Sequence, residues 1–274
     1  MDFLELEKKA KQIRINIIEM LAEAGSGHPG GSLSMTDILT VLYFDKMNVR
    51  PSEPKWEDRD RLVLSKGHGA PGLYGTLAEK GFFPKEELMK LRKCGEMLQG
   101  HPDMKGTPGI DMSTGSLGQG LSVANGMAIA GKLDKKDYRV YAICGDGEIQ
   151  EGQIWEAAMS ASHYKLDNLT VFIDNNGLQI DGSNSEVMGV DPIGDKFKAF
   201  GWHVIEIDGH DLKQISAAVD MAKTLKDKPT AIVAKTVKGK GVSFMENQVS
   251  WHGSAPNQEQ KEQAIAELKR GVQA

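Results

Sequence analysis

The sequence predicts an α/β fold, a mostly parallel sheet flanked by helices, and two observations support this. From residue 138 onward, apolar strand-like segments alternate with amphipathic helical segments of about ten to fifteen residues. Such alternation is typical of right-handed βαβ units, whose strands run parallel. The 274 residues, 40% hydrophobic and 26% charged, suit a globular chain with a sizeable core. We find no repeat or low-complexity linker, so we expect one domain over residues 1–274.

The first half of the chain is expected to supply helices and one short strand. Apolar residues at steps of three and four over residues 3–24 indicate an amphipathic helix that Gly25 ends. A second helix is expected to begin at Ser34, which has the spacing of a capping box with Asp37. The segment DRLVL, residues 60–64, has the composition of a short buried strand.

The second half supplies the repeating units of the sheet. The predicted strands cover residues 138–144, 169–174, 202–208 and 230–237. The predicted helices cover residues 151–164, 192–200, 212–225 and 258–270. Asp211 stands where a helix N-cap is expected.

Composition excludes several classes of function. The net charge of −5 argues against a nucleic-acid partner, which requires a basic face. No apolar run approaches the length of a membrane span, and the start MDFLELEKK lacks the basic and then apolar pattern of a signal peptide. Cys94 and Cys144 are far apart and form no C-x-x-C, as expected of free thiols in a reducing compartment. We therefore expect a cytoplasmic protein.

An acid and an amide follow two consecutive predicted strands. Asp146 follows the strand that ends near residue 144, and Asn176 follows the next one. A βαβ crossover brings both strand ends to the same edge, where open α/β sheets bind ligands. Hard oxygen donors with few carboxylates suit Mg²⁺, and Gly145 and Gly147 would let a phosphate group approach the backbone. The alternative is that Asp146 caps a helix beginning near residue 148.

The histidines give a second signal. Five of the seven adjoin a glycine, although glycine is only 31 of 274 residues: His28, His68, His101, His210 and His252. Such histidines are expected in bent loops, although for any one of them a surface turn is the simpler explanation. His163 and His203 lack this context and are expected to be structural.

The chain resembles a known family. GDG followed after about thirty residues by NN is the signature of thiamine diphosphate enzymes, and here it runs from GDGEIQEG to FIDNNGLQIDG. Further stretches resemble the N-terminal, diphosphate-binding domain of transketolase: SGHPGGSLS, DRDRLVLSKGHGAPGLYGTLAEKGFF, GHPD, STGSLGQGLSVANGMA and KTVKGKGVSFMENQVSWHG. Together they span residues 25–253 in order, which makes the resemblance specific.

The resemblance implies a cofactor site. It implies that the Asp146 and Asn176 side chains and the Leu178 carbonyl ligate Mg²⁺, for which Ca²⁺ or Mn²⁺ can substitute, at the diphosphate of thiamine diphosphate. Residues implied to contact the cofactor are His68, Gly115, Ser116, Leu117, Gly145, Asp146, Gly147, Asn176 and His252. For the small residues at 120–130 we favour plain helix packing instead.

The resemblance also implies catalytic groups. His28 and His101 are implied to hydrogen-bond the donor ketose and to assist proton transfer, and His252 to reach the substrate as well. Glu151 and Glu156 are implied to join a carboxylate network between two copies, although a solvated helix face would also explain them. Glu148 departs from the residue usual in long transketolases.

The implied reaction is the reversible transfer of a two-carbon ketol group from a ketose phosphate to an aldose phosphate, as in the pentose phosphate pathway. The family's activating glutamate lies on a pyrimidine-binding domain that this sequence does not contain. We therefore expect a C-terminal subunit of about 300 residues and two copies of each chain. The alternatives are a deoxyxylulose phosphate synthase-like or 2-oxo acid dehydrogenase-like subunit, another sugar ketol transferase, or a silent diphosphate-binding module.

Overall fold

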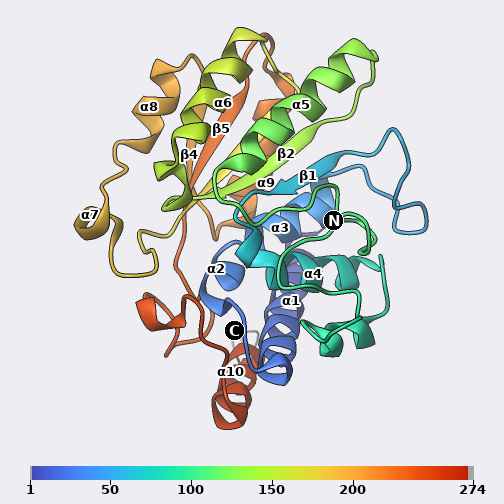
Figure 1. Cartoon of the computed structure of the whole chain (residues 1–274), viewed down its shortest axis with the longest axis vertical. Helices are drawn as coiled ribbons and strands as arrows, with labels where there is room; N and C mark the ends of the chain where they lie inside the picture. The colour runs from blue at the N-terminus through green and yellow to red at the C-terminus, as the bar shows by residue number, and fades with distance from the viewer. Residues whose placement is uncertain (1, 271–274) are drawn as a thin grey trace.

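The computed structural model describes residues 2–270 and contains the expected parallel sheet. Its strands are β1 (Arg61–Leu64), β2 (Val140–Gly145), β3 (Leu169–Asn175), β4 (His203–Asp208) and β5 (Thr230–Lys235). They pair in the order β1-β2-β3-β5-β4, and every pair is parallel (Figure 1). The α/β prediction is therefore confirmed, with strand ends shifted by one or two residues in places.

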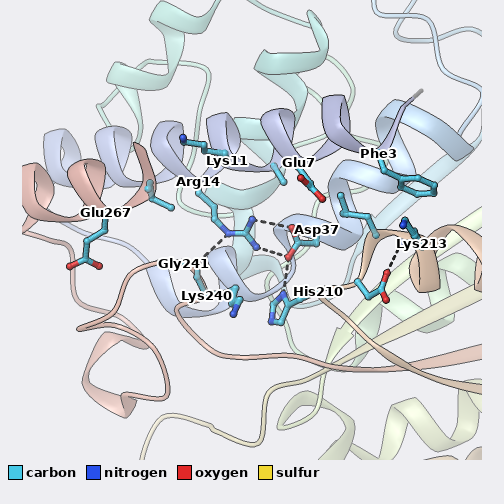
Figure 2. A pocket seen from close by; sticks show the side chains of 14 residues that line it. Phe3, Glu7, Lys11, Arg14, Asp37, His210, Lys213, Lys240, Gly241 and Glu267 are labelled. Carbon is cyan, nitrogen blue, oxygen red and sulfur yellow. Dashed lines mark hydrogen bonds and ion pairs between the residues drawn. The ribbon is translucent and has the colours of Figure 1, made fainter. Parts of the chain in front are cut away.

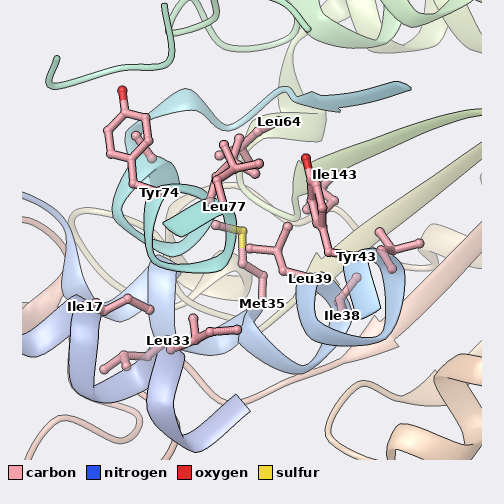
Figure 3. Packing of buried hydrophobic residues seen from close by; sticks show 14 of the residues in the cluster. Ile17, Leu33, Met35, Ile38, Leu39, Tyr43, Leu64, Tyr74, Leu77 and Ile143 are labelled. Carbon is pink, nitrogen blue, oxygen red and sulfur yellow. The ribbon is translucent and has the colours of Figure 1, made fainter. Parts of the chain in front are cut away.

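Helices cover both faces of the sheet. They are α1 (Phe3–Ala24), α2 (Pro29–Ser34), α3 (Thr36–Val41), α4 (Ala70–Lys80), α5 (Gln119–Leu133), α6 (Gly152–His163), α7 (Asn184–Val187), α8 (Ile193–Ala199), α9 (Leu212–Thr224) and α10 (Gln258–Arg270). Alternate residues of β2 enter different cores: Tyr141 and Ile143 pack with α1, α3, α4 and α9, and Ala142 and Cys144 pack with α5, α6 and α8. Figure 3 shows the first of these cores, in which Met35 and Leu39 meet Leu77 and Ile143. Burial on both faces explains the almost uninterrupted apolar strands.

The order of the strands places a crevice between β3 and β5. The chain passes from β3 over β5 to reach β4, with α8 on one face, and then returns through α9 on the other face to form β5. Open parallel sheets bind ligands at such a reversal, at the carboxyl ends of the strands. A ligand site is therefore expected among the segments that follow β3 and β5.

Local signals predicted some helix ends and missed one. Gly25 ends α1 with φ 63°, as expected, and Asp211 caps α9 by accepting the Lys213 and Gln214 N–H groups at 2.8 and 3.2 Å. The capping box at Ser34 is wrong, because Ser34 is the last residue of α2 and its hydroxyl donates to Asp174 at 2.6 Å. The Ser34 hydroxyl, which we expected to cap a helix, instead donates a hydrogen bond to the buried Asp174 carboxylate.

No helix in the described part of the chain, residues 2–270, has both the length and the hydropathy needed to cross a membrane.

A buried ion pair joins α1 to α3. The Arg14 guanidinium contacts both Asp37 carboxylate oxygens, at 3.0 and 2.6 Å, and each side chain is only 9% exposed. Burial alone would raise the pKa of Asp37, but the charge and hydrogen bonds of Arg14, with a hydrogen bond from His210, hold that pKa below its ordinary value. Asp37 is therefore charged in the folded chain.

We expect Asp37→Asn to lower the free energy of unfolding by about 3–5 kcal/mol, because it leaves a buried guanidinium without a counter-charge. Since the pKa of Asp37 is lowered by folding, its contribution is present at neutral pH and is lost as the pH falls below the ordinary value of 3.8 through the lowered one. Denaturant unfolding at several pH values measures both. Lys8→Gln, which breaks an exposed pair with Glu5, is the control and is expected to leave the free energy of unfolding nearly unchanged. Equal effects of the two substitutions would contradict the prediction.

Candidate functional site

A cavity of about 330 Å³ lies at the carboxyl edge of the sheet, where the reversal of strand order predicts a site. Its wall draws on segments that follow β1, β2, β3 and β5, and on the loop before α5. Most of the residues predicted from the sequence line it: His28, His68, Gly115, Leu117, Gly145, Asp146, Gly147, Glu151, Asn176, Leu178 and His252. Side chains far apart in the sequence thus share one wall.

Three predicted residues do not line this cavity. Ser116 and His101 line a neighbouring depression, which shares Gly115 with the cavity. Glu156 lies on the exposed face of α6. The His101 backbone is held by the Tyr74 hydroxyl, which donates to its carbonyl at 2.9 Å.

Asp146 is 2% exposed and is held by backbone donors. Its carboxylate accepts the Gly147 N–H at 2.8 Å and the Gly177 N–H at 2.5 Å. Burial, and next the charge of Asp174, raise its pKa to about 6. The helix-cap alternative is wrong, because the short 3₁₀ helix that begins at Glu148 has Gly147 as its N-cap residue and no side-chain capping bond. A nearby positive charge would stabilise the ionised form of this carboxyl.

The oxygens of Asn176 and Leu178 complete a set of hard donors with Asp146. The Asn176 side-chain oxygen accepts the Leu178 N–H at 3.1 Å, and its amide nitrogen lies 3.4 Å from Asp174. The Leu178 carbonyl accepts a hydrogen bond from the Lys238 ammonium at 3.1 Å, so this oxygen already faces a positive charge. A carboxylate, an amide oxygen and a carbonyl fit an Mg²⁺-type cation, which prefers oxygen ligands.

Three imidazole rings line the cavity together. The rings of His28, His68 and His252 lie 5.2 to 5.5 Å apart, centroid to centroid. Burial is the main cause that lowers their pKa values, to about 4, 2 and 3 respectively, and neighbouring positive charges add to it. Among the described residues, the buried His28 Nδ1 atom has no hydrogen-bond partner. The rings are therefore neutral at ordinary pH, and one of them presents an unsatisfied polar atom.

Sequence reasoning missed two lysines in this site. Lys66 is 2% exposed, donates to the Gly31 carbonyl at 2.8 Å and forms an ion pair with Asp174. Lys238 is also 2% exposed, and burial, then the charge of Lys66, lower its pKa to about 8. Each lysine follows a strand at the carboxyl edge of the sheet. The same position in the sequence identified Asp146 and Asn176, and it could have identified both lysines.

Glu148 has a structural role that the sequence did not predict. It is 3% exposed, and its carboxylate accepts the Gly118 and Gly145 N–H groups at 2.9 and 3.0 Å and the Ser65 hydroxyl at 2.5 Å. Burial raises the pKa of this carboxyl. It thereby ties three walls of the cavity together. Nearby, Gly120 lies so close to Ser65 that a Cβ atom would be 2.5 Å from its hydroxyl, which agrees with packing as the reason for a small residue there. The packing explanation does not extend to Gly126, which is exposed and where a Cβ atom would meet nothing within 4 Å.

His210 precedes the N-cap of α9, as expected, but its ring is not free. Its Nδ1 atom lies 2.8 Å from Asp37, and its Nε2 atom accepts the Val237 N–H at 2.8 Å. The prediction of a plain turn residue missed both contacts. His163 and His203 do not line the cavity.

We expect Gly67→Ala to destabilise the fold by about 1–3 kcal/mol, because overpacking forces the backbone apart. A Cβ atom on Gly67 would lie 2.7 Å from the Gly115 backbone nitrogen in the opposite wall. The matched control is Gly152→Ala, whose Cβ meets no atom within 4 Å and which is expected to leave stability unchanged or higher. Urea unfolding compares the two, and equal stability would refute the close approach of these loops.

Comparisons with known proteins agree with this geometry. Residues 6–272 match the family model described as transketolase, thiamine diphosphate binding domain. The chain is 49% identical to the 6-deoxy-6-sulfo-D-fructose transketolase subunit of Clostridium sp. strain MSTE9, covering 97% of each protein. It is 45% identical to an apulose-4-phosphate transketolase subunit of Phocaeicola vulgatus, covering 98% of this chain and 95% of that one.

Longer relatives match this chain over less than half of their own length. The transketolase of Homo sapiens is 44% identical over 98% of this chain, which spans 43% of that protein. The crystal structure of transketolase from Campylobacter jejuni superposes with a TM-score of 0.93 at 35% identity, covering 98% of this chain and 43% of that one. By sequence and by structure, the chain belongs to the transketolase family and corresponds to its thiamine diphosphate-binding domain.

Proposed function

We propose that this chain is the N-terminal subunit of a split transketolase, and that it binds Mg²⁺ and the diphosphate of thiamine diphosphate. The observation that carries the proposal is the convergence of Asp146, Asn176 and the Leu178 carbonyl with two buried lysines on one cavity. The reaction is the reversible transfer of a two-carbon ketol group from a ketose phosphate to an aldose phosphate, as in the pentose phosphate pathway.

The cation ligands are the Asp146 carboxylate, the Asn176 amide oxygen and the Leu178 carbonyl, and Ca²⁺ or Mn²⁺ can take the place of Mg²⁺. Gly145 and Gly147 line the same cavity and present no side chain, which lets a diphosphate approach the backbone. The ammonium groups of Lys66 and Lys238 supply positive charge for phosphate oxygens.

The remaining cofactor contacts come from residues on the cavity wall and from Ser116 in the adjoining depression. Neutral His68 and His252 donate to diphosphate oxygens, and residues 115–117 pack against the cofactor rings. When bound, thiamine diphosphate supplies the electron sink of the reaction. The protein's task is to hold that group and to exclude water from it.

The proton-handling groups are His28, His101 and His252. The lowered pKa values of these rings keep them neutral, so each can donate its one N–H to a substrate oxygen. His28, whose Nδ1 atom has no partner, can also accept a proton. We assign His101, which lines the adjoining depression, to the outer part of a substrate, and His28, whose buried Nδ1 atom has no partner, to the inner part.

The assembly we propose is two copies of this chain and two of a partner of about 300 residues, a size that holds two ordinary domains. Residues 1–274 form the diphosphate-binding domain, and the partner supplies the pyrimidine-binding and C-terminal domains with the activating glutamate. Glu151, the N-cap residue of α6, and Glu156, on the exposed face of that helix, can join a carboxylate network between copies. The match to nearly the whole length of two subunits supports a split enzyme, which we place in the cytoplasm.

The first test is a ketol-transfer assay with xylulose 5-phosphate and ribose 5-phosphate, Mg²⁺ and thiamine diphosphate. We expect no turnover by this chain alone and turnover by the complex that it recovers from its native lysate. Turnover by the chain alone would refute the dependence on a partner. Silence of a complex that still binds cofactor would favour the diphosphate-binding module.

A second test addresses the metal site by calorimetric titration of thiamine diphosphate with Mg²⁺. Asp146→Ala is expected to weaken binding by more than the roughly 10–100-fold that loss of a second-shell partner costs. It should leave the circular dichroism spectrum intact. Asp195→Ala, at an exposed position on α8, is the control and should bind as the wild type does. Unchanged Mg²⁺-dependent affinity in the Asp146 variant would exclude this carboxylate as a ligand.

A second candidate function is ketol transfer between other sugars. The two relatives that match along nearly their whole length are named for 6-deoxy-6-sulfo-D-fructose and apulose-4-phosphate. Offering these two ketoses and xylulose 5-phosphate to the complex, and comparing kcat/KM, decides between the candidates.

A further inference from the structure

The segment after β5, residues 236–241, carries a lysine into the cavity; we name it the Lys238 loop. The Lys238 ammonium nitrogen lies 3.1 Å from the Leu178 carbonyl and 2.8 Å from His252 Nδ1. Since a lysine has a long flexible stem, its position in the site depends on how firmly its backbone is held.

Two hydrogen bonds hold this loop from the side away from the cavity. The Val237 N–H, immediately before the lysine, donates to His210 Nε2 at 2.8 Å. The Lys240 carbonyl, two residues after it, accepts from Arg14 Nε at 3.1 Å. Figure 2 shows the side chains of Arg14 and His210 directed toward Asp37 between them.

Asp37, a residue of α3, contacts both of the side chains that hold the loop, Arg14 and His210. It accepts two hydrogen bonds from Arg14 and lies 2.8 Å from His210 Nδ1. A backbone N–H can only donate, so His210 Nε2 is the acceptor, and its Nδ1 carries the proton and donates to Asp37. Both ring nitrogens are thus in use, one toward the Lys238 loop and one toward α3.

We propose that His210 is a positioning residue, which uses the Arg14–Asp37 pair as its anchor to hold the Lys238 loop so that Lys238 reaches the cofactor cavity. His210 does not line that cavity and acts through Val237 and Lys238. The role in cofactor binding rests on the proposed function, whereas the hold on the loop does not.

A purely structural role is the competing explanation. The Lys238 loop has other supports, since the Gly239 N–H donates to Gly30 at 3.0 Å and the Asn247 N–H donates to Lys238 at 2.9 Å. If these sufficed, His210 would only satisfy buried polar groups, and its loss would lower stability without a specific effect on the cavity.

Two substitutions of His210 distinguish the hydrogen bond made by Nε2 from the one made by Nδ1. In His210→Gln the side-chain oxygen can take the place of Nε2 and accept the Val237 N–H, whereas in His210→Asn the shorter amide can only replace Nδ1 at Asp37. We expect the Gln variant, in complex with the partner, to bind thiamine diphosphate with Mg²⁺ within about twofold of the wild type. The Asn variant is expected to bind about tenfold more weakly.

Hydrogen exchange of the full chain without cofactor gives an independent readout. The peptide that contains residues 236–241 should exchange faster in the Asn variant than in the Gln variant or the wild type. Asp211→Ala is the matched control, because it removes the cap of α9 one residue away and lowers thermal stability without touching the loop. It should change neither the exchange of this peptide nor cofactor affinity.

The outcomes separate the two hypotheses. Equal loss of affinity in the Asn and Gln variants, or an equal loss in Asp211→Ala, would overturn the positioning role. If the wild-type complex itself fails to bind thiamine diphosphate, the proposed function fails, and the exchange of residues 236–241 still decides whether His210 holds the loop.

Discussion

The cavity is assembled around one buried negative charge, the Asp174 carboxylate at the end of β3. It is 0% exposed and pairs with Lys66 after β1, with the Ser34 hydroxyl of α2 and with the Thr236 hydroxyl after β5. Burial alone would raise its pKa, but Lys66 and the two hydroxyl donors outweigh burial and hold that pKa below its ordinary value. Segments distant in sequence converge there because an uncompensated buried carboxylate would cost far more than ordering them.

Carboxylates and ammonium groups lie close together in and beside the cavity, so that each negative charge has a positive charge near it. Asp146 and Asp174 sit side by side at the strand ends, and each raises the cost of ionising the other unless a cation stands nearby. Lys66 and Lys238 provide that charge on the protein side, while the three imidazole rings stay neutral. This arrangement of charges is what supports the proposal that a diphosphate binds here together with a divalent cation.

The sequence predicted the sheet, and through it the meeting of Asp146 and Asn176, because both follow from alternation and from strand polarity. It did not predict the hydrogen bonds of Ser34, since capping rules consider neighbours three or four residues away and its partner Asp174 is 140 residues distant. The position of Lys66 after β1 follows from strand polarity, but its ion pair with Asp174, 108 residues away, does not follow from any local pattern. Local patterns specify elements, whereas buried ionic networks depend on which elements the fold brings together.

The hydrogen bond between Lys238 and His252 determines which nitrogen of the His252 ring carries the proton. An ammonium group carries only donors, so His252 Nδ1 must accept, and the single proton of the neutral ring resides on Nε2. With the pKa of His252 lowered to about 3, a second proton does not join it near neutrality. The lysine therefore fixes the tautomer of the imidazole, and the Nε2–H of His252 is left as a hydrogen-bond donor to a ligand. This donor favours ligand atoms that accept a hydrogen bond, such as oxygens with lone pairs, and disfavours ligand groups that can only donate one.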